Sequence, residues 1–177
     1  MQIFKIVKVW NEWSSELRNY ETMKKTVAYV EGDIETADAV VAAFYKKDNE
    51  EEAARPDYLK RHPGDWVKFM SELIPEETAH FPEGTMCWVK HIKIADPDDL
   101  YANLDIEVVC NGTEEECREY ARTFGQMLSP FEYGDKDDYL EIVREKPPYK
   151  KYVFDDYSEE VVVEPGDPDY EIVEWDD

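Results

Sequence analysis

Basic side chains, cysteine, histidine and glycine are scarce in this 177-residue sequence, and each shortage narrows what the protein can be. Lys and Arg total 20 against 43 Asp and Glu, a formal net charge of -23. A chain this negative repels nucleic acid and anionic membrane, so direct binding to either is the least expected function. Three cysteines, an odd and sparse number, indicate buried thiols in a reducing compartment and not a disulfide framework.

Long apolar runs and phosphate-binding motifs are also missing. The start, MQIFKIVKVWNEW, alternates apolar with charged residues and lacks the apolar core of a signal peptide. No stretch approaches a membrane span. With seven glycines and no Walker, dinucleotide-binding or nucleophile-elbow motif, a phosphate cradle is not expected. We therefore expect a cytoplasmic protein without a cofactor.

What the sequence does contain is a folded composition. Hydrophobic residues make up 42% and aromatic residues 14% of the chain, well above a disordered acidic protein. The length suits one domain or two small modules. Residues 2–10 alternate in polarity as a strand does, whereas residues 11–25 fit either a short helix or a long hairpin arm.

Two segments, residues 26–44 and 106–124, share one pattern. Each has a β-branched run, a turn glycine at Gly32 or Gly112, and then an apolar stripe with helical spacing. Asn111-Gly112 forms the second turn, and Thr113 with Glu116 is expected to form a capping box.

Each of these segments also follows a strand candidate, so the sequence predicts two similar β-β-α units at 1–48 and 86–130. Between them, residues 55–77 place Trp66, Phe69, Met70 and Leu73 at helical spacing, with Asp65 as the N-cap. Hairpins followed by helices predict an α+β fold: a mostly antiparallel sheet with helices on one face, spanning residues 1–154.

The last 23 residues, 155–177, hold eleven acids and no base. Residues 137–145 and 150–157 read as strands before this segment. Within it, 159–164 and 170–175 are β-branched or aromatic and flank the turn signal at 165–169. The sequence therefore favours an acidic C-terminal hairpin over a solvated tail.

Catalytic and metal chemistry is weakly indicated. His62, His80 and His91 lie in two loops and a strand candidate, where a structural or surface role is expected. Cys87 and His91, four apart on a strand, project about 13 Å apart and would not share one zinc ion with Cys110 and Cys117. The acid clusters at 96–99, 135–138 and 165–169 lack the calcium-loop progression, so no metal site is predicted.

Charge combined with shape supports the leading hypothesis, a non-enzymatic inhibitor or nucleic-acid mimic that binds a basic, nucleic-acid-handling protein. Alternate residues of a strand lie about 6.6 Å apart, comparable with successive phosphates, so Asp167, Asp169 and Glu171 are expected to form a row. Tyr157, Tyr170 and Trp175 are candidate apolar anchors. The predicted partner-binding residues are Asp155, Asp156, Glu159, Glu160, Glu164, Asp167, Asp169, Tyr170, Glu171, Glu174 and Trp175.

This sequence is similar to anti-restriction, anti-CRISPR and toxin immunity proteins only in charge, size and the lack of a catalytic motif, because no motif aligns. A phage-encoded protein of this type would act in the host cytosol. Two alternatives stay open. The first is an interaction module with acids only for solubility, in which Val161 to Val163 or Trp175 contact a neutral partner. The second is a small enzyme or ligand-binding protein with a site between the repeat units, using carboxylates such as Asp105 or Glu107.

Overall fold

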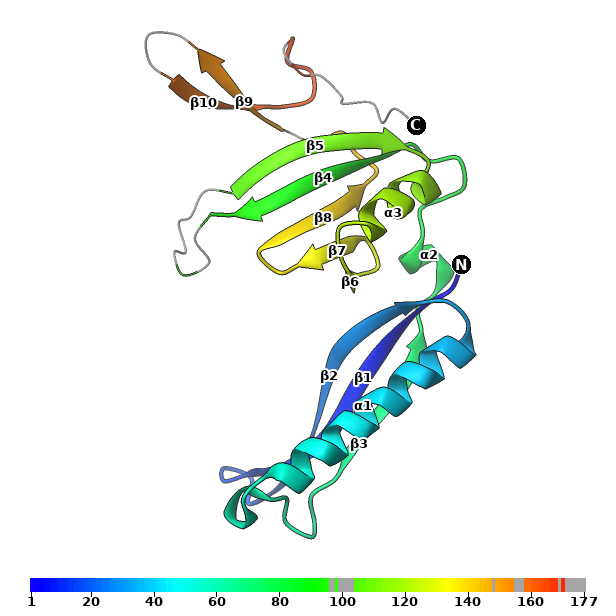
Figure 1. Cartoon of the computed structure of the whole chain (residues 1–177), viewed down its shortest axis with the longest axis vertical. Coiled ribbons are helices and arrows are strands. Elements are labelled where there is room, and N and C mark those ends of the chain that lie inside the picture. The colour runs from blue at the N-terminus through cyan, green and yellow to red at the C-terminus, as the bar shows by residue number, and fades with distance from the viewer. Residues whose placement is uncertain (96–97, 99–103, 148, 155–157, 169, 171–177) are drawn as a thin grey trace. The chain divides into compact units, whose positions relative to one another are not determined.

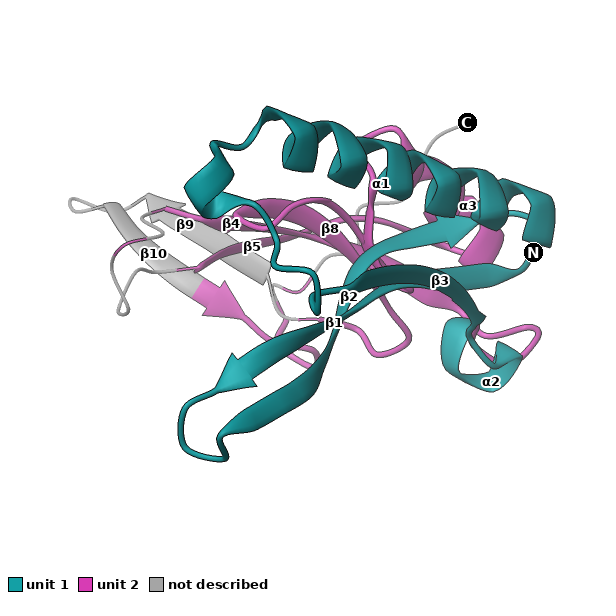
Figure 2. Ribbon diagram, turned by 90° about the horizontal axis from the view of Figure 1, so that it is seen from below, with its two compact units in different colours: residues 1–79 teal, residues 80–177 magenta. Residues whose placement is uncertain are grey.

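The computed structural model describes residues 1–95, 98, 104–147, 149–154, 158–168 and 170, with backbone alone for 149–154 and 158–161 (Figure 1). The chain divides into two compact units, residues 1–79 and 80–177, shown in separate colours in Figure 2. Among the described residues, none of the helices has the length and apolar character needed to cross a membrane. Both units contain antiparallel sheets and few helices, which confirms the predicted α+β class.

Unit 1 is a three-stranded antiparallel sheet in the order β2-β1-β3, packed against the long helix α1 (Figure 1). Its buried core comes mainly from β1, where Ile3, Phe4, Ile6 and Val7 are at most 3% exposed. The elements are β1 (Ile3–Ser14), β2 (Asn19–Glu31), α1 (Ile34–Ala54), a 3-10 turn (Asp57–Leu59), β3 (Val67–Leu73) and α2 (Glu76–Ala79).

The ambiguous residues 11–25 form a hairpin arm. Pairing of β1 with β2 continues to Ser14 and Asn19, and Arg18 adopts a positive φ of 51° in the connecting turn. The Trp13 and Tyr20 rings pack edge to face across the arm, 5.4 Å between centroids. This cross-strand aromatic pair favours the strand conformation over the helix.

The prediction of a helix within residues 55–77 is wrong, because residues 67–73 form the strand β3. This strand pairs antiparallel with β1, from Val67 opposite Trp10 to Leu73 opposite Phe4. Its one buried side chain, Phe69, stacks on Phe44 of α1 with 5.5 Å between centroids. Tertiary pairing with β1 therefore overrides the helical spacing of the apolar residues.

Asp65, predicted as the N-cap of that helix, serves a turn instead. Its carboxylate accepts a hydrogen bond from the His62 N–H at 3.0 Å. The loop that follows is attached to β1 by Asn11, whose amide donates to the Gly64 carbonyl oxygen and accepts from the Trp66 N–H, both at 2.9 Å. These bonds position β3 for its pairing.

Unit 2 contains a five-stranded sheet in the order β5-β4-β8-β7-β6 and a separate two-stranded pair, β9 and β10. Helix α3 packs on the larger sheet over a core that includes Cys87, Cys117, Tyr133 and Leu140. The elements are β4 (Cys87–Ile94), β5 (Leu104–Gly112), α3 (Glu114–Arg122), β6 (Met127–Ser129), β7 (Glu132–Asp135), β8 (Asp138–Val143), β9 (Tyr149–Phe154) and β10 (Ser158–Val163).

The two units share one topology. In each, the first strand is central, the second pairs antiparallel on one side, a helix follows, and a later strand pairs on the other side. Unit 2 differs because the hairpin β6–β7 is inserted between its helix and that later strand. The β-β-α pattern read from the sequence is present in both.

Helices α1 and α3 begin with the same sequence feature, a glycine followed by an N-cap residue. Asp33 accepts the Thr36 N–H at 2.9 Å. Thr113 accepts the Glu116 N–H at 3.2 Å while the Glu116 carboxylate accepts the Thr113 N–H at 2.9 Å, which confirms the predicted capping box.

The strand predicted at 159–164 is present as β10, but its partner among the described residues is the preceding strand. Glu159 lies opposite Val153 and Val163 opposite Tyr149 in this antiparallel pair. The predicted second arm, 170–175, lies outside the described residues except for Tyr170. The turn predicted at 165–169 is present over the part that is described, with Gly166 at a φ of 98°.

Candidate functional site

The predicted partner-binding residues fall into three groups. Asp155, Asp156, Asp169, Glu171, Glu174 and Trp175 lie outside the described residues, as does Tyr157. Glu159 and Glu160 lie on β10. Glu164 and Asp167 are exposed, whereas Tyr170 is buried.

Asp167 belongs to a turn and not to a strand. Its carboxylate accepts the Glu164 N–H at 3.0 Å, and its carbonyl oxygen accepts the Tyr170 N–H at 3.0 Å. The predicted strand-spaced row beginning at Asp167 is therefore wrong at its first member. The carboxylate is still at the surface, but the turn fixes its direction.

Tyr170 contacts an earlier part of unit 2, at Lys146 and Pro147. The residue is 9% exposed, and its hydroxyl donates to the Pro147 carbonyl oxygen. The Lys146 ammonium lies 3.7 Å from the ring centroid, close enough for a cation-π contact. A ring covered in this way is not an exposed anchor for a partner.

The two histidines of unit 2 contact carboxylates, and its three cysteines are buried. His91 contacts the Asp138 carboxylate, and His80 Nδ1 lies 2.6 Å from Glu114 Oε2. Cys87, Cys110 and Cys117 are free and buried. Among the residues that the structure describes, no three His, Cys, Asp or Glu side chains are grouped to hold a metal ion.

Burial makes these thiols poor nucleophiles. Desolvation, with a smaller contribution from the Glu114 carboxylate, raises the pKa of Cys87 to about 11. A hydrogen bond with Cys110 and desolvation raise the pKa of Cys117. Because the thiolate is the reactive form, we assign both groups to the core and not to chemistry.

Sequence reasoning missed a buried ionic network around Arg118, which is 0% exposed. Its Nε lies 3.1 Å from Glu114 Oε2, and its Nη1 donates to the Pro130 carbonyl oxygen at 2.6 Å and to the Tyr133 hydroxyl at 3.0 Å. The guanidinium also lies 5.0 Å from the Phe131 ring centroid. The spacing of Glu114 and Arg118, four apart on a helix, was the available signal.

The exposed charged side chains in the described part of unit 2 are mostly acidic. Among the described residues, eleven acidic side chains are exposed and only Lys93, Lys136 and Arg144 are exposed bases. The exposed acids are Glu83, Asp98, Asp105, Glu107, Glu115, Glu116, Glu119, Asp135, Glu145, Glu164 and Asp167.

The other described bases of unit 2 are used within the chain. Arg118 is buried in its network, Arg122 pairs with Glu115 at 3.1 Å, and Lys90 pairs with Glu141 at 3.2 Å. Lys146 lies over Tyr170. Internal pairing therefore removes cations from the surface while leaving most carboxylates exposed.

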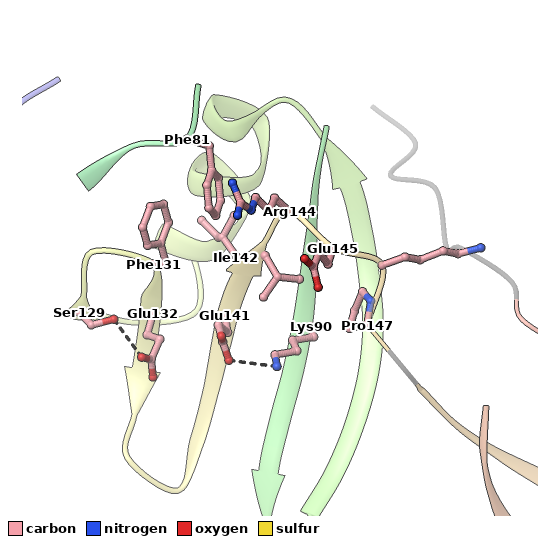
Figure 3. Close-up of a pocket in the computed structure, with 12 residues that line it drawn as sticks. Phe81, Lys90, Ser129, Phe131, Glu132, Glu141, Ile142, Arg144, Glu145 and Pro147 are labelled. Atoms are coloured by element: carbon pink, nitrogen blue, oxygen red, sulfur yellow. Dashed lines mark hydrogen bonds and ion pairs between the residues drawn. The ribbon is translucent and has the colours of Figure 1, made fainter. Parts of the chain in front are cut away.

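An open pocket of about 510 Å³ lies within unit 2 (Figure 3). The Phe81 and Phe131 rings stack at one end, 4.3 Å between centroids. Its charges are mixed: Glu141 pairs with Lys90, Glu132 accepts a hydrogen bond from Ser129 at 3.0 Å, and Arg144, Glu145 and Lys146 also line it.

The carboxylates considered for acid/base chemistry, Asp105 and Glu107, are not among the residues that line this pocket. Both are exposed on β5. Neither residue therefore lies in an enclosed setting.

Comparison with family models, curated proteins and solved structures gave no significant match. The functional conclusion is therefore drawn from the described geometry and charge.

Proposed function

We propose that this protein is a non-enzymatic binding protein whose acidic unit 2 docks on a basic surface of a nucleic-acid-handling protein and competes with its nucleic acid. The observation that carries the proposal is the eleven exposed acids against three exposed bases in the described part of unit 2. Such a surface draws affinity from the same counterion release that drives nucleic-acid binding.

The C-terminal segment, residues 155–177, is part of this surface. Residues 155–177 supply eleven acids, of which Glu164 and Asp167 are exposed on the described turn. The Tyr170 hydroxyl donates to the Pro147 carbonyl oxygen, which attaches the turn that carries Glu164 and Asp167 to Pro147. The proposed binding surface is thus the exposed acidic side chains of unit 2, those of this segment included.

Solubility alone is a weaker account of the charge. A net charge of magnitude about 2 to 8 is sufficient to keep a small domain in solution. The chain carries -23, and 27 of its 43 acids but only 9 of its 20 bases belong to unit 2. Solubility does not require this concentration in one unit, whereas a surface that competes with nucleic acid for a basic groove, as in a protein of the anti-restriction, anti-CRISPR or immunity type, would use it.

The proposal is tested by capture followed by competition. The full chain is immobilised and exposed to native host lysate at low and high salt, and each captured protein is purified and tested for binding in the presence of double-stranded DNA. We expect a basic partner that is released by salt and displaced by DNA. A partner that binds equally well at high salt and ignores DNA would contradict mimicry and favour an uncharged interface.

Truncation is a poor test of the C-terminal segment. Deleting residues 155–177 removes β10 and the buried side chains of Val163 and Tyr170 along with the acids. Neutralising Glu164, Glu171 and Glu174 to Gln keeps the fold elements and removes only charge. Weaker and less salt-dependent binding by this variant is expected if the segment contacts the partner.

A further inference from the structure

The outer edge of β2 is open to another strand. The sheet order β2-β1-β3 places β2 at an edge, and no strand of the described residues pairs with its outer side. Residues 19–26 are all exposed, and α1 packs mainly against β3. Figure 2 shows the end of the β1–β2 hairpin projecting away from α1. Unpaired N–H and C=O groups on such an edge are a template for pairing with another chain.

The charge pattern of this hairpin is unfavourable within one chain. Glu12 lies opposite Glu21 on the paired strands, and Lys8 lies opposite Lys25. Like charges directly opposite each other disfavour strand pairing. Because side chains alternate along a strand, Glu21, Met23 and Lys25 share one face, with Met23 midway between the acid and the base.

Two of these four charges contact Trp10: Glu12 accepts a hydrogen bond from its Nε1–H at 2.9 Å, and Lys8 lies 5.0 Å from its ring centroid. Neither Glu21 nor Lys25 forms an ion pair with a described residue, and both are exposed. Four residues along a strand separate them by about 13 Å, so they cannot pair with each other. Met23 is 37% exposed. The edge thus presents an acid and a base at equal distances on either side of an exposed apolar side chain.

We propose that the β2 edges of two copies of this chain pair antiparallel about Met23, joining two three-stranded sheets into one. In this register Glu21 lies opposite Lys25 of the second copy, Lys25 lies opposite its Glu21, and the two Met23 side chains meet at the two-fold axis. The acidic pair Glu12 and Glu21 then faces the basic pair Lys25 and Lys8 of the second copy across the new ladder. The interface is self-complementary, as a two-fold symmetric contact requires.

Charge repulsion between two copies is expected to be weaker at unit 1 than at unit 2. It exposes eleven acidic and eight basic side chains, a far closer balance than in unit 2. The regular edge is short, because the register of β1 and β2 shifts between Ile6 and Val7, opposite Val27. A ladder over residues 20–26 buries a small area, so we expect a weak, concentration-dependent dimer.

The test is sedimentation equilibrium of the full chain over a wide range of concentration. The wild-type chain should dimerise. Glu21→Lys and Lys25→Glu should each raise the dissociation constant at least about tenfold, because each places like charges opposite at both ends of the ladder. Glu16→Lys, the same charge change in the turn, is the matched control and should leave dimerisation unchanged.

Two further measurements separate the interface from the fold. Each single variant removes a like-charge pair within its own hairpin, so neither should lower thermal stability. An equimolar mixture of Glu21→Lys and Lys25→Glu chains should form a heterodimer, and the double variant should dimerise as wild type does. A wild-type chain that stays monomeric throughout, or a dimer indifferent to both reversals, would overturn the proposal.

Discussion

Unit 1 carries 16 acidic and 11 basic side chains, whereas unit 2 carries 27 and 9. Both are built on the same strand, strand, helix, strand order. In unit 1 the long helix α1 buries only Ala37 and the charges of the surface are mixed. In unit 2 the shorter α3 buries Cys117, Arg118 and Ala121. The comparison shows that one strand and helix order carries two different surfaces: the described surface of unit 1 has mixed charge, and that of unit 2 is mostly acidic.

The largest expected effect is on the buried network that unit 1 lacks. Arg118→Met leaves the Glu114 carboxylate, the Pro130 carbonyl and the Tyr133 hydroxyl without the guanidinium. We expect a loss of about 3–5 kcal/mol in the free energy of unfolding of unit 2. Denaturant titration followed by thiol labelling measures it, because all three cysteines belong to unit 2.

Asp38 is the matched control, since it lies five residues after its N-cap Asp33 as Arg118 does after Thr113. It is exposed, so Asp38→Ala should change the free energy of unfolding of unit 1, measured by hydrogen exchange in β1, by less than about 0.5 kcal/mol. An equal loss in both variants would mean that the burial of Arg118 does not distinguish the two units.

The inserted hairpin β6–β7 is a second difference between the units, and a substitution within it can test its contribution to the stability of unit 2. Gly134 in β7 has a φ of 131°, and an added Cβ would lie 2.7 Å from the Asp138 carbonyl oxygen. Gly134→Ala should therefore destabilise unit 2 by about 2–3 kcal/mol, observed as faster thiol labelling and hydrogen exchange in β7 and β8. Gly84→Ala is the control: its φ is 81° but nothing lies within 4 Å, so only backbone strain of about 1 kcal/mol is expected.

The helix caps are a shared feature and should respond alike. Thr113→Ala removes the acceptor for the Glu116 N–H and should cost unit 2 about 1 kcal/mol. Asp33→Ala removes the equivalent bond to Thr36 and should destabilise unit 1 in the same direction. Hydrogen exchange of the two helices measures each effect separately. No loss of protection in the helix whose cap is removed would contradict the expected contribution of these caps.

Acid should weaken unit 2 through Glu114. Burial alone would raise the pKa of this carboxyl, but hydrogen bonds from His80, the Phe81 N–H and Arg118 hold it below its ordinary value. Its stabilising contribution is therefore present above the unfolded pKa of about 4.3 and is lost as the pH falls through the lower, folded pKa. Unfolding of unit 2 followed from neutral pH to acid should give a shallower decline for Glu114→Gln than for wild type.

Local signals in the sequence predicted much of the fold. Gly32 and Gly112, each followed by a cap and an apolar stripe, identified both strand-to-helix units because these interactions span only a few residues. Strand β3 was missed, because Trp66, Phe69, Met70 and Leu73 have helical spacing and only pairing with β1 decides their conformation.

The candidate site was predicted less well, for a similar reason. Charge counting identified an acidic segment, and residues 155–177 remain part of the proposal. It could not predict that Tyr170 is buried against Lys146 and Pro147, or that Arg118, Arg122 and Lys90 are paired internally. The surface charge of unit 2 depends on which cations the fold covers, and that is decided by contacts between distant residues.

The most direct test of the account compares two neutralised full-length chains of equal net charge. One carries Gln at the exposed unit 2 positions Glu107, Glu119, Glu145 and Glu164; the other carries Gln at the exposed unit 1 positions Glu16, Glu50, Glu51 and Glu77. Affinity for the captured basic partner is measured by calorimetry as a function of salt. We predict that the unit 2 variant binds more weakly and with a shallower salt dependence, while the unit 1 variant stays close to wild type. Equal losses in the two variants would contradict the assignment of partner binding to unit 2.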